Sequence, residues 1–374
     1  NALPRYSGSP ITLSDVKEDL TKLDDFVSQF SLRDLADFTV CNGSCWGPGK
    51  SGAAGKLASS KRLGVPMLYM SDGNCCVNLN RTTTGFPSSN LLAGTFNKSL
   101  AYKVGKVLAD ESKENGISIN LGPGGNLHRN ILCGRHPEYY SEDPILTGTL
   151  MAYQARGLEE NGVIATYKHL IANNMEFERK SAHGIIDENT LRDLYLRVFD
   201  KAFSLYKPGC VMTSYTPVNG IYPCENSALL NDLLRGEWGF DGAVITDYCD
   251  HHSYMNGDQA LRAGGSLWMA GFIGGKMAFE TGSNSYLQAL RRAAKEALYM
   301  YLHVRVTNRD YAESIGDTAA VRHDFKPAVL GWRHLVALID LVAVALFALA
   351  IRGIVRDVKL YKAAKAAKAE NKNA

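Results

Sequence analysis

Short apolar runs rich in β-branched residues alternate with amphipathic helical patterns from about Asp37 to Leu302. This alternation is typical of βαβ units around a parallel sheet, because parallel neighbours are usually joined through a helix. The predicted strands are residues 38–41, 66–70, 117–121, 163–167, 210–214, 243–246 and 266–269. The predicted helices are residues 98–115, 146–161, 188–206 and 286–302. We therefore expect an α/β fold, a (β/α)8 TIM-like barrel of regular or irregular form.

The predicted barrel occupies residues 37–308, after a leading segment and helix at residues 1–36. A linker at residues 309–330 would connect it to the C-terminal part of the chain. With 374 residues and 45% hydrophobic composition, the chain is long enough to bury the core of one such domain.

Charge and cysteine content exclude two classes of partner. Lys and Arg number 41 and Asp and Glu 38, and the surplus of +3 comes from the tail that starts at Arg352. The body therefore has no basic field of the kind that binds nucleic acid. The eight cysteines lack paired CxxC spacing, so we expect small buried thiols, no metal site and no cofactor.

The segment from Leu335 to Ile351 is almost continuously apolar, and basic residues follow it from Arg352 onward. We predict a transmembrane helix at residues 331–352 and a basic cytoplasmic tail at residues 353–374. The positive-inside rule then predicts a single-pass protein of the cell membrane, with its catalytic body outside the cell. Asp340 is costly inside hydrocarbon, and the alternative is a buried or interfacial helix of a soluble protein.

One predicted strand ends on a carboxylate. Residues 237–247 read from a glycine-containing turn through an apolar run to Asp247. Parallel α/β folds build their sites at the carboxyl ends of strands, so Asp247 is the residue for which we most expect chemistry. The alternative is that Asp247 only caps the following loop.

Other polar residues follow the remaining predicted strands. They are Asp72, Lys168, His169 and Tyr215, and they would share one rim with Asp247. Carboxylates and cations bind vicinal hydroxyls, while Tyr215 and Trp268 add flat apolar surface. The predicted ligand is therefore rich in hydroxyl groups.

Several longer motifs occur in a fixed order along the first 300 residues. They are residues 64–66 leading into Asp72-Gly73, Phe86-Pro87, 121–124, 134–144, Lys168-His169 with 173–176, 212–215 with Asn219-Gly220, and 234–240 leading into Thr246-Asp247. In this order they resemble glycoside hydrolase family 3, the β-glucosidase family. The resemblance implies a catalytic barrel of the type that is N-terminal in most members.

The resemblance also implies site roles. Asp247 would be the nucleophile of a retaining mechanism. The first subsite would be formed by Asp72, Arg135, Lys168, His169, Met212, Tyr215 and Tyr248. Tyr248 stands where a Trp is common in the family, and Asn74-Cys75-Cys76 departs from the usual pattern after Asp72.

Three alternatives stay open for individual residues. Arg135 would otherwise be an ion-pair partner of Glu138, Glu142 or Asp143. Lys168 would otherwise be a Schiff-base lysine, and His169 a core histidine with satisfied hydrogen bonds.

The general acid/base is a further question. Relatives take this Glu from an α/β sandwich domain, and the stretch between Ala270 and Trp332 is too short to hold one. A chain that begins at Asn1 fits the C-terminal half of a member with the reversed domain order. A smaller branch uses a loop His, but Ser181 replaces the acidic partner expected before His183.

The resulting hypothesis is a retaining exo-β-glycosidase that releases terminal non-reducing β-D-glucosyl residues from an oligosaccharide or β-glucoside. Glucose is favoured because Asp72 matches the glucosidase type of the family, where xylosidases tend to have Glu. The alternative is a catalytically incomplete sugar-binding barrel at the cell surface.

Overall fold

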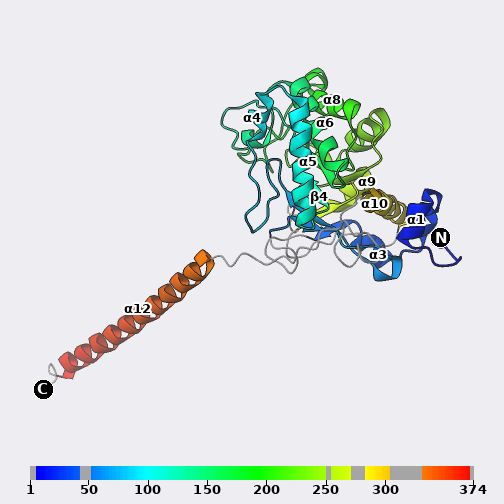
Figure 1. Ribbon diagram of the computed structural model, residues 1–374. Coiled ribbons are helices and arrows are strands. Elements are labelled where there is room, and N and C mark those ends of the chain that lie inside the picture. Colours follow the sequence, from blue (N-terminus) through cyan, green and yellow to red (C-terminus); the bar gives the residue numbers. More distant parts are fainter. Residues whose placement is uncertain (1–5, 43–51, 250–253, 271–282, 304–330, 371–374) are drawn as a thin grey trace. The chain divides into compact units, whose positions relative to one another are not determined.

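The computed structural model describes residues 6–42, 52–249, 254–270, 283–303 and 331–370 (Figure 1). The chain divides into two compact units, Asn1–Phe325 and Lys326–Ala374. The boundaries that the sequence predicts inside the first unit, at residues 37 and 308, stay predictions. Of the eight cysteines, the seven in the described residues carry free thiols, and Cys45 lies outside those residues.

A mixed sheet of eight strands forms the centre of the first unit, in the order β7-β6-β5-β4-β3-β2-β1-β8. The strands are β1 Val40–Asn42, β2 Gly55–Lys56, β3 Tyr69–Asp72, β4 Ile119–Leu121, β5 Ile164–Leu170, β6 Cys210–Thr213, β7 Ala243–Ile245 and β8 Trp268–Ala270. Neighbouring strands are parallel except around β2, which is antiparallel to both β1 and β3.

The predicted (β/α)8 barrel is therefore wrong, and the fold is a mixed α/β fold with a half-barrel sheet. The residues between β2 and β3 form no α-helix, and antiparallel neighbours need no helical crossover. At the other end, the ladder stops between β7 and β8, where the described residues show only a single bridge from Ile245 to Leu267. A two-residue strand such as Gly55–Lys56 has too little pattern to be predicted from sequence.

Helices cover the sheet from outside. In the described residues of the first unit, the α-helices are α1 Leu13–Glu18, α2 Leu23–Ser28, α3 Leu32–Asp37, α4 Ser89–Ala93, α5 Lys98–Glu114, α6 Pro144–Glu159, α7 Glu188–Thr190, α8 Leu196–Leu205, α9 Gly257–Ala263 and α10 Asn284–His303. Two π-helical segments lie at Leu191–Tyr195 and Ala228–Glu237, and single 3₁₀ turns at Leu20–Lys22, Lys61–Leu63, His136–Glu138 and Pro223–Glu225.

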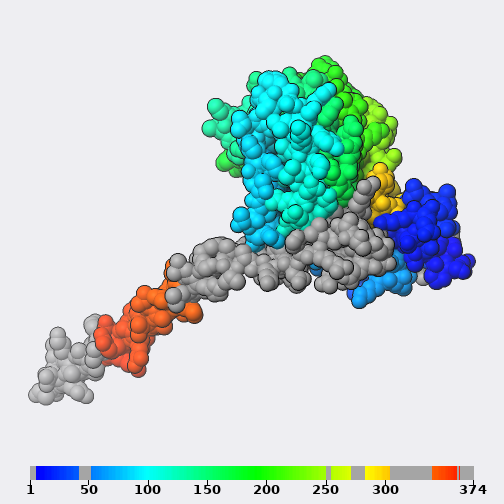
Figure 2. Space-filling model, in the orientation of Figure 1, coloured from blue at the N-terminus to red at the C-terminus, as the bar shows by residue number. Residues whose placement is uncertain are grey.

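Helices α5, α6 and α8 pack side by side in that order (Figure 1). Gly105 of α5 and Gly157 of α6 make this close approach feasible. A Cβ at Gly105 would lie 2.1 Å from the Gln154 carbonyl oxygen, and one at Gly157 2.2 Å from that of Tyr102. The outward surface of α5, in cyan, belongs to the face of the unit that Figure 2 shows.

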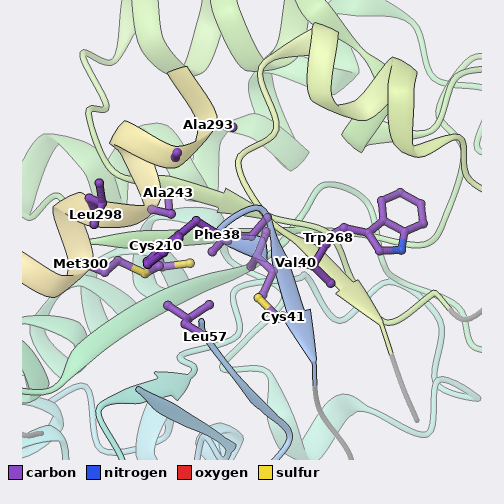
Figure 3. Packing of buried hydrophobic residues seen from close by; sticks show 14 of the residues in the cluster. Phe38, Val40, Cys41, Leu57, Cys210, Ala243, Trp268, Ala293, Leu298 and Met300 are labelled. Carbon is purple, nitrogen blue, oxygen red and sulfur yellow. The ribbon is translucent and has the colours of Figure 1, made fainter. Parts of the chain in front are cut away.

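Two hydrophobic clusters lie on either side of the strands. One joins β1, β6, β7 and β8 to α10, and Figure 3 shows Val40, Cys210, Trp268 and Leu298 packed within it. The other packs the opposite strand faces, including Tyr167 of β5, against α5, α6 and α8. Burial on both faces fixes the strand ends, and with them the side chains that follow each strand.

The described residues of the C-terminal unit form the helix α12 Gly331–Glu370. The predicted transmembrane helix is wrong, because no helix in the described part of the chain is long and apolar enough to cross a membrane. Asp340 and Arg352 bound an apolar run of only 11 residues, 341–351, and a span requires about 20. The predicted location outside the cell depended on this span and has no other support.

Candidate active site

A cavity of about 470 Å³ lies at the carboxyl ends of the strands of the first unit. Its lining includes all eight residues predicted for the site, which are Asp72, Arg135, Lys168, His169, Met212, Tyr215, Asp247 and Tyr248. Sequence reasoning did not select the six other lining residues, Gly52, Ala54, Asn78, Leu121, Arg179 and Met269. The structure therefore brings the predicted residues together, while their individual roles stay predictions.

Asp247 follows β7 by two residues and is 8% exposed. Its Oδ1 accepts the Tyr248 backbone N–H at 2.7 Å, so one oxygen does cap the loop. Its Oδ2 has no hydrogen-bond partner among the described residues. Burial raises the pKa of Asp247, whereas the Tyr248 amide, Arg135, Lys168 and the Tyr215 hydroxyl oppose this rise. The carboxylate thus has one fixed oxygen and one available to a ligand.

Lys168 lies within β5 with its side chain buried among acids. Its Nζ is 2.9 Å from Glu138 Oε1 and 3.3 Å from Asp72 Oδ1. Burial alone would lower the pKa of Lys168, but the charges of Glu138 and Asp72 outweigh burial and the pKa lies above its usual value. A Schiff-base lysine needs a lowered pKa, so this pairing disfavours that alternative.

Arg135 contacts the same carboxylate from the other side. Its Nε and Nη2 both lie 2.6 Å from Glu138 Oε2, and its Nη1 lies 3.8 Å from Glu176 Oε1. Glu138 is therefore the ion-pair partner among the three alternatives considered from sequence. Asp143 instead caps α6, where it accepts the Leu146 N–H at 2.6 Å.

His169 acts as a neutral support in this arrangement. Burial lowers its pKa well below the usual value, and the charges of Arg135, Lys168 and Arg179 add to this effect. Arg135 only donates, so its Nη2 at 2.9 Å makes Nε2 of His169 the acceptor. The ring proton then lies on Nδ1, which is 3.2 Å from Asn126 Oδ1. Nε2 also lies 3.6 Å from Asp247 Oδ2. Because Nε2 carries no proton, it cannot donate to that oxygen.

Tyr215 and Arg179 form the next part of the wall. The guanidinium of Arg179 lies 4.4 Å from the centre of the Tyr215 ring, and its Nη1 donates to Glu176 Oε2 at 2.6 Å. Burial and the charge of Asp247 raise the pKa of Tyr215, so its hydroxyl stays protonated. Glu176 and Arg179 lie in a loop and turn rather than a helix, so no local sequence signal indicated Arg179.

The remaining residues differ in exposure. Met212 of β6 is buried, whereas Tyr248 has 37% of its surface exposed. His183, the alternative acid considered from sequence, is exposed and is not among the residues that line the cavity. The cavity thus combines an available carboxylate oxygen with fixed cations and aromatic surface, which suits a polyhydroxylated ring.

A family model, the glycosyl hydrolase family 3 N terminal domain, matches residues 51–290. The chain belongs to glycosyl hydrolase family 3. The order of motifs that indicated this family in the sequence is thereby confirmed.

Relatives of this family member are β-glucosidases. A β-glucosidase of Ruminococcus albus is 34% identical over 343 residues, which are 86% of this chain and 36% of that protein. β-Glucosidase A of Butyrivibrio fibrisolvens is 37% identical over 250 residues, 66% of this chain and 30% of that protein. The chain thus spans about a third of the length of these curated relatives.

Solved structures of β-glucosidases are also similar to this chain. β-Glucosidase 3B of Thermotoga neapolitana in complex with α-D-glucose superposes with a TM-score of 0.69 at 31% identity. The match covers 78% of this chain and 45% of that one. A β-glucosidase of Paenibacillus barengoltzii gives a TM-score of 0.73 at 30% identity, over 83% of this chain and 36% of that one.

Proposed function

We propose that this chain carries the nucleophilic half of a retaining exo-β-glycosidase that acts on terminal non-reducing β-D-glucosyl residues. The observation that carries the proposal is the Oδ2 of Asp247, a buried carboxylate oxygen without a partner among the described residues, in a cavity with fixed cations. In the first step Oδ2 attacks the anomeric carbon and the aglycone leaves. In the second step water attacks the same carbon and releases Asp247.

The charges around the cavity support a sugar as substrate. Arg135, Lys168 and Arg179 are fixed donors, and the half-exposed carboxylate of Asp72 is an acceptor for vicinal hydroxyls. Glucose is favoured because the solved relative from Thermotoga neapolitana holds α-D-glucose. Hydroxyl contacts that strengthen as the ring distorts would lower the barrier.

The general acid/base would come from outside this chain, on an α/β sandwich domain as in the expectation from sequence. Glu138 pairs with two of the cavity cations, Lys168 and Arg135, and it does not suit the role. Burial raises the pKa of Glu138, but the charges of Lys168 and Arg135 outweigh burial, and the pKa lies below its usual value. The carboxyl is therefore ionised at neutral pH and has no proton to donate. Without an acid, hydrolysis of ordinary glucosides would be slower by roughly 10²–10⁴-fold.

Glucosides with an activated leaving group test this proposal, because they need little protonation. We expect the chain to turn over 2,4-dinitrophenyl β-D-glucoside and to leave methyl β-D-glucoside almost untouched. Asp247→Ala should reduce the first activity by about 10³-fold or more. Asp241→Ala, the same change at an exposed residue, is the matched control and should retain activity.

Two outcomes would contradict the proposal. Turnover that survives Asp247→Ala would remove Asp247 from the reaction. Glucose binding with no turnover of the activated glucoside would favour the sugar-binding alternative.

A further inference from the structure

Glu138 is the carboxylate on which two of the cavity cations meet. Its Oε1 lies 2.9 Å from Lys168 Nζ, and its Oε2 lies 2.6 Å from Nη2 of Arg135. Each oxygen therefore holds one cation. The cations come from distant parts of the chain, Lys168 from β5 and Arg135 from the loop after β4, and Glu138 fixes their separation.

The backbone of Glu138 is anchored as well. The residue ends the 3₁₀ turn His136–Glu138, and its carbonyl oxygen accepts Nδ2 of Asn74 at 2.5 Å. Asn74 Oδ1 in turn accepts the Gly124 N–H at 3.1 Å. Because Asn74 follows Asp72 in the chain, Glu138 is linked to the end of β3 through its backbone and, by way of Lys168, through its side chain.

The local charge balance depends on this residue. Arg135 and Lys168 lie close enough that the charge of Arg135 lowers the pKa of Lys168, and burial lowers it more strongly. The charges of Glu138 and Asp72 oppose both effects. Asp72 is half-exposed and 3.3 Å away, whereas Glu138 is more buried and 2.9 Å away, so Glu138 is the stronger partner.

We propose that Glu138 is a positioning residue of this site, which holds Lys168 and Arg135 at the cavity wall beside Asp247 without touching the substrate. This inference rests on the proposed function, since it concerns how the cations are presented to a glucosyl ring and to Asp247. Without the shared carboxylate the adjacent positive charges of Lys168 and Arg135 would repel each other, and only the longer pairs with Asp72 at 3.3 Å and Glu176 at 3.8 Å would oppose this repulsion among the described residues.

Glu138→Gln tests the proposal, since Gln keeps the size of the side chain and removes its charge. Lys168 would then lose its proton at lower pH. We expect the alkaline limb of the pH profile of kcat/KM for 2,4-dinitrophenyl β-D-glucoside to move down by about one pH unit or more. The maximal kcat/KM should fall by about 10²-fold. Glu142→Gln, an exposed change four residues away, should leave the profile unchanged.

Two further variants separate positioning from a merely structural role. In a Lys168→Met background, Glu138→Gln should no longer shift the alkaline limb, because the group whose protonation it controls is absent. Glu138→Asp keeps the charge on a shorter side chain, so it should retain the position of the alkaline limb while kcat falls. A Glu138→Gln profile that matches the unaltered protein, with only the melting temperature lowered, would overturn the proposal.

Glucose affinity gives a readout that does not depend on turnover. Calorimetry between pH 7 and 10 should show that glucose binding weakens at lower pH in Glu138→Gln than in the unaltered protein. That shift in a chain without hydrolytic activity would support the role of Glu138 and contradict the proposed function. Identical pH dependence of binding in an active chain would overturn the role of Glu138 and leave the proposed function in place.

Discussion

At Asp247 two electrostatic effects act in opposite directions. Burial favours the protonated carboxyl and raises its pKa, while the Tyr248 N–H, Arg135 and Lys168 favour the carboxylate. The net pKa lies above the usual value, so the ionised form at neutral pH costs folding free energy. A reactive carboxylate in a buried position is therefore maintained at some expense in stability.

Asp247→Asn should make this cost visible. The protonated carboxyl of the unaltered protein is the more stable form, and its contribution is lost as the pH rises through the raised pKa. Asn is neutral at every pH, so the variant does not lose stability in this way as the pH rises. We expect the melting temperature of Asp247→Asn at pH 7 to exceed that of the unaltered protein by about 2–4 °C, which corresponds to roughly 1 kcal/mol. The two should converge near pH 3.5, and a less stable variant at pH 7 would contradict this account.

The sequence predicted which residues share the cavity where a side chain lies near the carboxyl end of a strand. Asp72 ends β3, Lys168 lies two residues before the end of β5 and Asp247 follows β7 by two residues, and topology brings such positions to one edge. Glu138 was considered only as an ion-pair partner, and Arg179 was not selected. Both depend on the conformation of long loops, which local pattern does not determine.

At the scale of elements, apolar periodicity located the long segments. Helix α5 and strand β6 begin at the predicted residues, 98 and 210. The predicted helix at residues 188–206 is interrupted, because Leu191–Tyr195 is π-helical between α7 and α8. Strand β2 was missed because Gly55 and Lys56 carry neither apolar alternation nor β-branched side chains.

The starts of β5 and β6 depend on one carboxyl group at the end of α6. Glu159 Oε1 accepts the backbone N–H groups of Ala165 at 3.0 Å and Gly209 at 2.6 Å, and Oε2 accepts the Tyr206 hydroxyl at 3.0 Å. Burial raises the pKa of Glu159 to about 7, although these three hydrogen bonds oppose the rise. The folded protein is therefore more stable with Glu159 protonated than with Glu159 ionised.

This carboxyl predicts a pH-dependent stability. Its contribution is complete below the unfolded value of about 4.5 and is lost as the pH rises to about 7. Chemical denaturation should show the unaltered protein losing on the order of 1–3 kcal/mol over this interval through Glu159. Glu159→Gln should remove that loss, whereas Glu160→Gln at the exposed neighbour should retain it. Equal pH dependence in Glu159→Gln and the unaltered protein would refute the prediction.

At the scale of the whole molecule, sequence pattern was less informative. The prediction of a barrel was wrong because β2, which lies antiparallel between β1 and β3, changes the sheet. It does so without changing the apolar pattern of the other seven strands. The prediction of a membrane span was wrong because Asp340 and Arg352 limit the apolar run in the described residues. Family membership was predictable because it depends on many short motifs in one order.

The central claim is that Asp247 forms a covalent glycosyl intermediate, and 2,4-dinitrophenyl 2-deoxy-2-fluoro-β-D-glucoside tests it most directly. The fluorine slows both steps, and the activated leaving group restores the rate of the first step alone, so the intermediate should accumulate. Peptide mapping by mass spectrometry should then find one 2-deoxy-2-fluoroglucosyl group on Asp247. A label on another carboxylate, or turnover of the unfluorinated glucoside with no label, would contradict the account.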